Sequence, residues 1–196
     1  MHPNRIFAWE DRDAMLALAA ETSFATIALD GPLVAHAPVV VAGPDRLRFH
    51  LARGNRAVAG LDGGRAILSF LGPDAYVSPD WYGSADQVPT WNYLAVEAEG
   101  PLRQLDEDEL ATLLDDLGAV HEKRLAPKPA WTRAKMSPGR FEAMLKAIIG
   151  FELTIEALRG TRKLGQHKKE AERDGAADGL APFHPAMAAL MREAGR

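Results

Sequence analysis

Apolar and polar residues alternate over several short segments of the chain, the pattern of β-strands with one buried face. The clearest case is residues 47–52, where Leu47, Phe49 and Leu51 occupy every second position. In residues 90–99 the same period places Trp91 and Tyr93 on one face, and Asn92 and Leu94 on the other. Further strands are predicted at residues 24–29, 33–41, 66–71 and 148–158.

Helices are predicted where a capping residue precedes an apolar stripe. Asp11 or Asp13 begins a first helix that runs to about residue 20. Asp106, with Glu109 three residues later in the spacing of a capping box, begins a longer one. Ser137, followed by proline, begins a third helix that is predicted to run through residue 147. The polar, alanine-rich tail after residue 166 is also expected to be helical.

Turn residues separate the predicted strands. Residues 30–32, Asp-Gly-Pro, join two strands into a hairpin, and residues 43–45, Gly-Pro-Asp, turn the chain again. Residues 72–89 are dense in Gly, Pro, Ser and Asp but contain Tyr76, Trp81 and Tyr82, so a functional loop is expected there.

At least six strands with helices inserted irregularly between them argue against a parallel, doubly wound sheet. The pattern favours an α+β, mainly β fold built on a closed or partly closed antiparallel barrel. We expect one domain over residues 1–180 and a helical C-terminal tail over residues 181–196.

Composition excludes several classes of site. The chain has no Cys, which excludes disulfides, thiolate metal sites and a thiol nucleophile. Its six His residues show no metal-ligand spacing, so no metal site is expected, and the common nucleotide, zinc-protease and serine-hydrolase motifs are missing. The N-terminus lacks a secretory signal and no segment is apolar enough to span a membrane, so a cytoplasmic protein is expected. The net charge of −4 gives no general attraction to nucleic acid.

Three segments could carry chemistry. Residues 50–55, a strand end that leads into a helix start, combine free N–H groups with Arg53; they suit a phosphate, or are an ordinary surface arginine beside a cap. Residues 76–82 and 88–93 hold two aromatic clusters; they suit a planar ligand, or a dimer interface or minor core. Residues 159–169 are basic; they suit phosphate, nucleic acid or solvent.

The aromatic segments closely resemble the signature of the PaiB-like family of FMN-binding split-barrel proteins. The resemblance rests on Tyr-Val-Ser-Pro-Asp-Trp-Tyr at residues 76–82 and Val-Pro-Thr-Trp-Asn-Tyr at 88–93, with supporting matches at residues 35–38, 50–55, 149–152 and 163–166. These matches occur in the family's order over roughly residues 1–180. The family tends to have Trp-Lys-Leu-Ser-Gln-Asn where this chain has Arg-Lys-Leu-Gly-Gln-His at residues 162–167.

The resemblance implies a split β-barrel, Greek-key-like and with peripheral helices, that binds FMN at the two-fold interface of a homodimer. It implies that Arg53 and Asn55 lie near the flavin phosphate and that Lys163 and Gln166 approach from the C-terminal segment. The other implied cofactor-binding residues are His36, Ser78, Trp81, Thr90, Trp91 and Asn92. No catalytic residue is assigned.

The sequence leaves three candidate functions. The resemblance implies a negative transcriptional regulator that binds FMN. The alternative is a flavin-dependent oxidoreductase, of the flavin reductase or pyridoxamine phosphate oxidase kind, in which His36 and His50 are the available acid–base groups or are simply barrel histidines. The third is direct DNA binding through the basic residues between 159 and 173, although the sequence shows no helix-turn-helix pattern.

Overall fold

The computed structural model describes residues 2–194. The chain forms two compact units. We call one the barrel unit, made of Leu16–Phe70 and Glu97–Leu158. The other is the sheet unit, made of Met1–Met15, Leu71–Val96 and Arg159–Arg196. The assignment of residues 1–180 to one domain stays a prediction.

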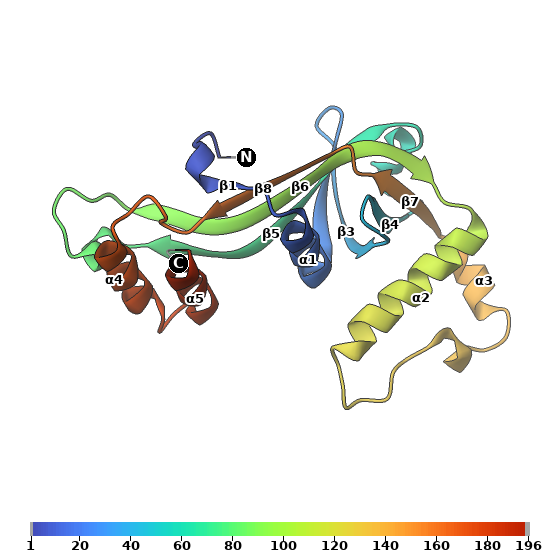
Figure 1. The fold of residues 1–196 in the computed structure, drawn as a ribbon. Coiled ribbons are helices and arrows are strands. Elements are labelled where there is room, and N and C mark those ends of the chain that lie inside the picture. Colours follow the sequence, from blue (N-terminus) through green and yellow to red (C-terminus); the bar gives the residue numbers. More distant parts are fainter. Residues whose placement is uncertain (1, 195–196) are drawn as a thin grey trace. The chain divides into compact units, whose positions relative to one another are not determined.

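Six antiparallel strands form a ring in the barrel unit (Figure 1). They are β2 (Phe24–Leu29), β3 (Val34–Val41), β4 (Arg46–Ala52), β7 (Ile148–Thr154) and parts of β5 (Arg65–Val77) and β6 (Thr90–Gln104). The order β6-β5-β2-β3-β4-β7 is closed by pairing of β7 with β6. Because β2, β3 and β4 follow one another and β5 returns beside β2, the connection is a Greek key, as predicted.

Alternation along the strands builds the core of the ring. Ile27, Leu47, Phe49 and Phe151 are all fully buried. Phe49 faces Phe151 directly in the β4–β7 register, and their ring centroids lie 5.6 Å apart. Each such side chain contributes about 1.5–3 kcal/mol on burial. The predicted buried face of residues 47–51 is therefore confirmed.

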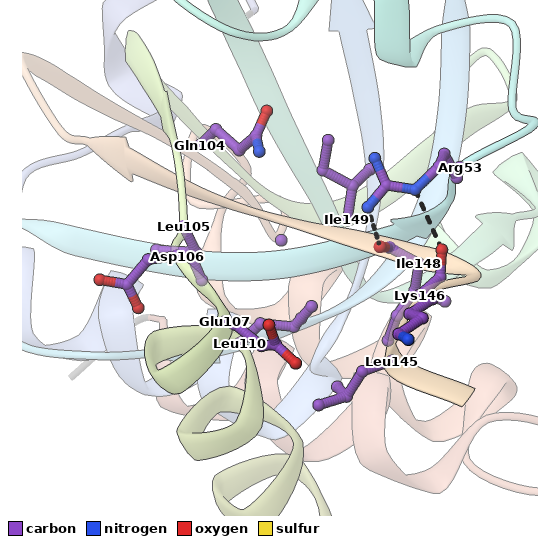
Figure 2. Close-up of a pocket in the computed structure, with 11 residues that line it drawn as sticks. Arg53, Gln104, Leu105, Asp106, Glu107, Leu110, Leu145, Lys146, Ile148 and Ile149 are labelled. Carbon is purple, nitrogen blue, oxygen red and sulfur yellow. Dashed lines mark hydrogen bonds between the residues drawn. The ribbon is translucent and has the colours of Figure 1, made fainter. Parts of the chain in front are cut away.

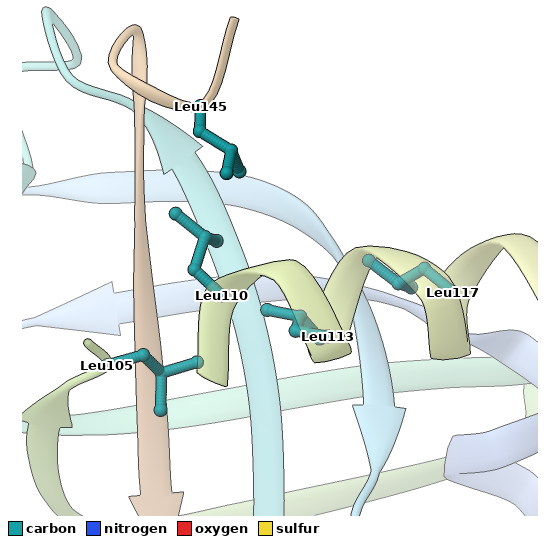
Figure 3. Close-up of a cluster of buried hydrophobic side chains, with 5 residues drawn as sticks. All are labelled: Leu105, Leu110, Leu113, Leu117 and Leu145. Atoms are coloured by element: carbon teal, nitrogen blue, oxygen red, sulfur yellow. The ribbon is translucent and has the colours of Figure 1, made fainter. Parts of the chain in front are cut away.

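Helices cover the outside of the ring. The helices are α1 (Arg12–Thr22), α2 (Glu107–Lys123) and α3 (Arg140–Leu145), with short 3-10 turns η2 (Val58–Gly60) and η4 (Arg133–Lys135). Figure 3 shows the leucines that fix α2, namely Leu105, Leu110, Leu113, Leu117 and Leu145. Gly150 of β7 makes this approach possible, because a Cβ there would lie 3.0 Å from the Leu105 and Leu110 methyl carbons.

The predicted helix caps are present for α1 and α2 and absent for α3. Asp11 accepts a hydrogen bond from the Ala14 amide, and Asp106 and Glu109 form both hydrogen bonds of the capping box. The third helix is shorter than predicted. It begins after Gly139, whose φ is +75°, rather than at Ser137, and it ends before β7 begins.

The sheet unit has a four-stranded sheet in the order β1-β8-β6-β5. Here β1 (Ala8–Trp9) pairs with β8 (Ala157–Lys163), and the unit also contains η1 (Arg5–Phe7), η3 (Pro79–Tyr82), α4 (Glu170–Leu180) and α5 (Pro185–Glu193). The prediction of helix after residue 166 is confirmed for the described residues. No helix within residues 2–194 is long and apolar enough to cross a bilayer.

Two predicted boundaries were wrong. The loop expected from residue 72 begins only after Val77, because burial of Ala75 and Val77 keeps the chain extended past Gly72 and Pro73. The single strand expected over residues 148–158 is two strands. Between them the Ile155 amide donates to the Asp45 carbonyl at 2.7 Å and the Glu156 amide to the Glu99 carbonyl at 3.0 Å. These bonds turn the chain out of β7 and into β8.

Candidate functional site

Arg53 directly follows β4 in the barrel unit, and its side chain is hydrogen-bonded to the turn between α3 and β7. Its Nε donates to the Lys146 carbonyl and its Nη2 to the Ile148 carbonyl, both at 3.1 Å (Figure 2). The Arg53 amide donates to the Ala147 carbonyl at 2.8 Å. A guanidinium has five N–H donors, so these bonds leave donors free in an exposed side chain.

The pocket beside Arg53 has a volume of about 220 Å³ and carries both signs of charge. Lys146 and Arg53 line it together with Asp106 and Glu107. The Asp106 carboxylate is occupied by the first turn of α2, since its Oδ1 accepts from the Glu109 amide at 2.8 Å. An anion near Arg53 would therefore lie beside two carboxylates of α2. That of Asp106 is already hydrogen-bonded, and that of Glu107 lies on the first turn.

Asn55 and His50 flank Arg53 in the sequence. The Asn55 side chain is hydrogen-bonded to the backbone, and the His50 imidazole is enclosed. Asn55 Oδ1 accepts from the Ala57 amide at 3.0 Å, which is the local cap that the alternative interpretation of this segment expects. His50 Nδ1 is enclosed and has no hydrogen-bond partner within residues 2–194, and burial lowers the pKa of its imidazole. The third barrel-unit candidate, His36, is exposed on β3 and stacks on Phe24 with ring centroids 6.4 Å apart.

In the sheet unit, strand alternation divides the predicted Thr90–Asn92 group between two faces. Asn92 is buried, whereas Trp91 is 51% exposed. Trp91 packs edge-on to Tyr76, with ring centroids 6.3 Å apart, and its indole N–H donates to the Asp74 carboxylate at 2.9 Å. Thr90 and Asn92, two residues apart on the strand, lie on the opposite face of the sheet from Trp91.

Lys163 reaches Thr90 from β8. Its Nζ donates to Thr90 Oγ1 at 2.6 Å and lies 5.8 Å from the centroid of the Phe7 ring. Burial lowers the pKa of the Lys163 ammonium group. The structure therefore places the Lys163 ammonium group against the 90–92 segment. The role of the pair in cofactor binding stays a prediction.

Gln166, Ser78 and Trp81 already have partners inside the sheet unit. Gln166 Oε1 accepts from the Leu164 amide at 2.8 Å, and its Nε2 donates to the Arg162 carbonyl. Ser78 Oγ accepts from the Asp80 amide at 3.4 Å and so caps η3. Trp81 stacks on Phe183 with centroids 6.5 Å apart. These contacts give each of the three residues a structural role that does not require a ligand.

Trp81 also packs against two glycines of α4, Gly175 and Gly179. A Cβ at Gly179 would lie 2.4 Å from Trp81 Cγ, and one at Gly175 would lie 2.7 Å from the Trp81 carbonyl oxygen. The two glycines, one helical turn apart, therefore permit η3 to approach the backbone of α4. Sequence reasoning missed this role, although the i, i+4 glycine spacing inside a helix was a signal for it.

The ten predicted residues thus fall into two groups. His36, Arg53 and Asn55 belong to the barrel unit, and the other seven belong to the sheet unit. Within the barrel unit Arg53 keeps free donors, and within the sheet unit Trp91 keeps exposed ring surface and Lys163 keeps donors, so each group taken by itself fits a part of a flavin. Within residues 2–194, no group of three or more His, Asp or Glu residues is arranged to hold a metal ion.

Known structures with this fold include flavin proteins. The FAD and heme binding protein from Mycobacterium smegmatis matches with a TM-score of 0.60 and 20% identity, over 80% of this chain and 73% of that one. The flavocytochrome Anf3 from Azotobacter vinelandii matches with a TM-score of 0.59 and 18% identity, over 83% and 72%. These similarities show that the predicted split-barrel fold is correct.

Sequence relatives give the family. Protease synthase and sporulation protein PAI 2 of Bacillus subtilis is 34% identical over 159 residues, which cover 78% of this chain and 75% of the relative. An uncharacterized protein of Emericella nidulans is 29% identical over 179 residues, 83% of this chain and 70% of the relative. The family model described as "Putative FMN-binding domain" matches residues 1–157. The chain therefore belongs to this FMN-binding family, as its resemblance to the PaiB-like proteins predicted, and FMN is its cofactor.

Proposed function

We propose that the protein binds FMN at the interface of a homodimer and acts as a regulator of the PaiB type. The observation that carries this proposal is the Trp91–Tyr76 pair. Both rings are about half exposed, at 51% and 47%, on the paired strands β6 and β5. Large aromatic surface left open on a sheet face suits a planar ligand or a partner subunit.

Arg53 and Lys163 are the proposed partners of the flavin's anionic groups. Each is a cation with donors beyond those used in the structure; Arg53 directly follows β4, and Lys163 is the last residue of β8. Asn55, Ser78 and Gln166 are proposed to act by shaping their turns, since their side chains cap or brace the backbone. FMN, when bound, supplies redox chemistry at its ring system, and the protein's part is to hold and orient it.

A spectrum and a mass measurement test the proposal together. Purified protein should show flavin absorbance in the visible range after FMN addition and should have the mass of a dimer by light scattering. Trp91→Ala should weaken both properties, whereas Trp131→Ala, a similarly exposed tryptophan of the barrel unit, should change neither. Unchanged FMN affinity and an unchanged dimer in Trp91→Ala would remove Trp91 from the site.

Regulation is proposed to be indirect. Helices α4 and α5 contact each other and are joined by a short turn, yet residues 170–193 carry five acidic residues and two arginines. Such a helix pair is repelled by the phosphates of DNA. If residues 159–173 bound DNA directly, binding would fall steeply with salt and would be lost when Arg162, Lys163, Lys168 and Lys169 are neutralised. A flat salt response excludes this alternative.

A flavin-dependent oxidoreductase is the second candidate. The names of the structural neighbours favour it, since one binds FAD and heme and another is a flavocytochrome. Oxidation of NADH or NADPH by the FMN-loaded protein, with an electron acceptor present, separates this candidate from a regulator without turnover. His50→Gln leaves such turnover intact if the enclosed imidazole is a structural group.

A further inference from the structure

Asn92 and Arg173 are two buried polar side chains of the sheet unit, and each has enclosed polar atoms without a hydrogen-bond partner in the described residues. Asn92 is 1% exposed and Arg173 is 6% exposed. Asn92 Nδ2 and Oδ1 and Arg173 Nε are fully enclosed and have no hydrogen-bond partner in the part of the chain that the structure describes. Buried polar groups are nearly always hydrogen-bonded, so this pair requires a complement.

Gly165 brings the two side chains to one place. A Cβ added to it would lie 3.8 Å from Arg173 Cγ and 4.0 Å from Asn92 Nδ2. The φ of Gly165 is +81°, a conformation that residues with a side chain rarely adopt. Gly165 thus lies against both the Asn92 amide and the Arg173 side chain, and it adds no side chain of its own there.

The Glu172 carboxylate, one residue before Arg173 on the first turn of α4, already has two hydrogen-bond donors. It accepts from Ser84 Oγ at 2.8 Å and from the Lys169 amide at 3.2 Å. Burial, and then the positive charges of Lys168 and Lys163, lower the pKa of His167, which lies two residues after Gly165. A buried guanidinium without a counter-ion destabilises a fold, and a bound anion removes that cost.

We propose that Asn92 and Arg173 form a binding site for a phosphate group. The guanidinium and the amide N–H₂ are donors, and a phosphate has enough oxygen atoms to accept from both. Arg173 is the fourth residue of α4, and the first turn of this helix adds N–H groups and the positive end of a helix dipole. The group belongs either to FMN, in which case Asn92 and Arg173 hold the flavin phosphate in place of Arg53, or to free phosphate. The first source depends on the proposed function, and the second does not.

Thermal unfolding in inorganic phosphate tests the site. At a phosphate concentration about 100 times Kd, the Tm of the flavin-free protein should rise by roughly 5 °C or more relative to chloride at equal ionic strength. Arg173→Met should abolish the rise and should itself unfold at the same temperature as the wild type or higher, because a buried charge is gone. Asn92→Leu should reduce the rise. Arg162→Met, which removes an arginine outside the pair, should retain it.

Flavin titrations identify the source of the phosphate. If the group is that of FMN, phosphate competes with FMN, and Arg173→Met lowers the affinity for FMN but not for riboflavin. If the phosphate is free, FMN binding is unchanged in the variant while the Tm effect is lost. A protein that binds no FMN but keeps an Arg173-dependent Tm rise contradicts the proposed function and supports this site. No rise in the wild type, or an equal rise in Arg173→Met, overturns it.

Discussion

Arg103 and Glu109 form a two-point ion pair. Arg103 Nη1 donates to one carboxylate oxygen of Glu109 at 2.7 Å and Nη2 donates to the other at 2.9 Å. The same guanidinium also reaches Glu152 on β7 at 2.9 Å. Because Glu109 is the N3 residue of the α2 capping box, the pair ties the first turn of the helix to β6.

The pair predicts an acid sensitivity of the fold. The hydrogen bonds from Arg103 and then from the Asp106 amide hold the pKa of Glu109 at about 2, below its usual 4.5. A carboxylate with a lowered pKa in the folded state stabilises above its unfolded pKa, and this stability is lost as the pH falls from about 4.5 toward 2. Denaturant titrations across this pH range measure the loss.

Glu109→Gln should lower the free energy of unfolding at pH 7 by about 1–2 kcal/mol, because it removes a charge-assisted pair and weakens a cap. The loss of stability between pH 4.5 and 2 should also shrink in this variant. Glu107→Gln, at an exposed position of the same turn, is the control and should change the stability by less than about 0.5 kcal/mol. Equal effects of the two substitutions would contradict the assigned role of the pair.

The contact of Trp81 with α4 predicts opposite signs for two glycine substitutions. Gly179→Ala should destabilise by about 1–3 kcal/mol, because the added Cβ would lie 2.4 Å from Trp81 Cγ. Gly118→Ala in α2, where nothing lies within 4 Å of the added Cβ, should stabilise by about 0.5–1 kcal/mol through helix propensity. Urea unfolding of both variants gives the comparison. A stabilising Gly179→Ala would show that η3 does not press against the helix.

Arg53→Ala should weaken FMN binding by about 1.5–3 kcal/mol if its guanidinium meets the flavin phosphate. The control is the neighbouring, exposed Arg56→Ala, which should leave the affinity unchanged. Fluorescence titrations with FMN and riboflavin separate a phosphate contact from a ring contact, since only FMN binding should respond. Arg53 also bonds two carbonyl oxygens, so the stability of the flavin-free variant is measured alongside.

Removal of the flavin supplies a further test. FMN bound to the native state alone adds about 2.7 kcal/mol of stability at 100 times its Kd. The FMN-loaded protein should therefore unfold at a higher Tm than the stripped protein, and the difference should disappear in Trp91→Ala if this ring faces the cofactor. Calorimetry of the loaded and stripped forms provides both values.

The sequence by itself determined the elements whose signals are local. The alternation of Leu47, Phe49 and Leu51 gave a strand with the correct buried face, and Asp106 with Glu109 gave the start of α2. These predictions held because pleat geometry and helix capping act over a few residues. The paired aromatic motif likewise identified the family, since the order of short motifs along a chain needs no folded structure.

The tertiary structure decided what depends on residues distant in sequence. It continued β5 through Gly72 and Pro73, where local signals indicate a break, because burial of Ala75 and Val77 outweighs the intrinsic preference of the two residues. It also placed Asn92, Gly165 and Arg173 around one point. No period along the chain encodes such a meeting, because packing alone determines which side chains are enclosed and which of them find a partner.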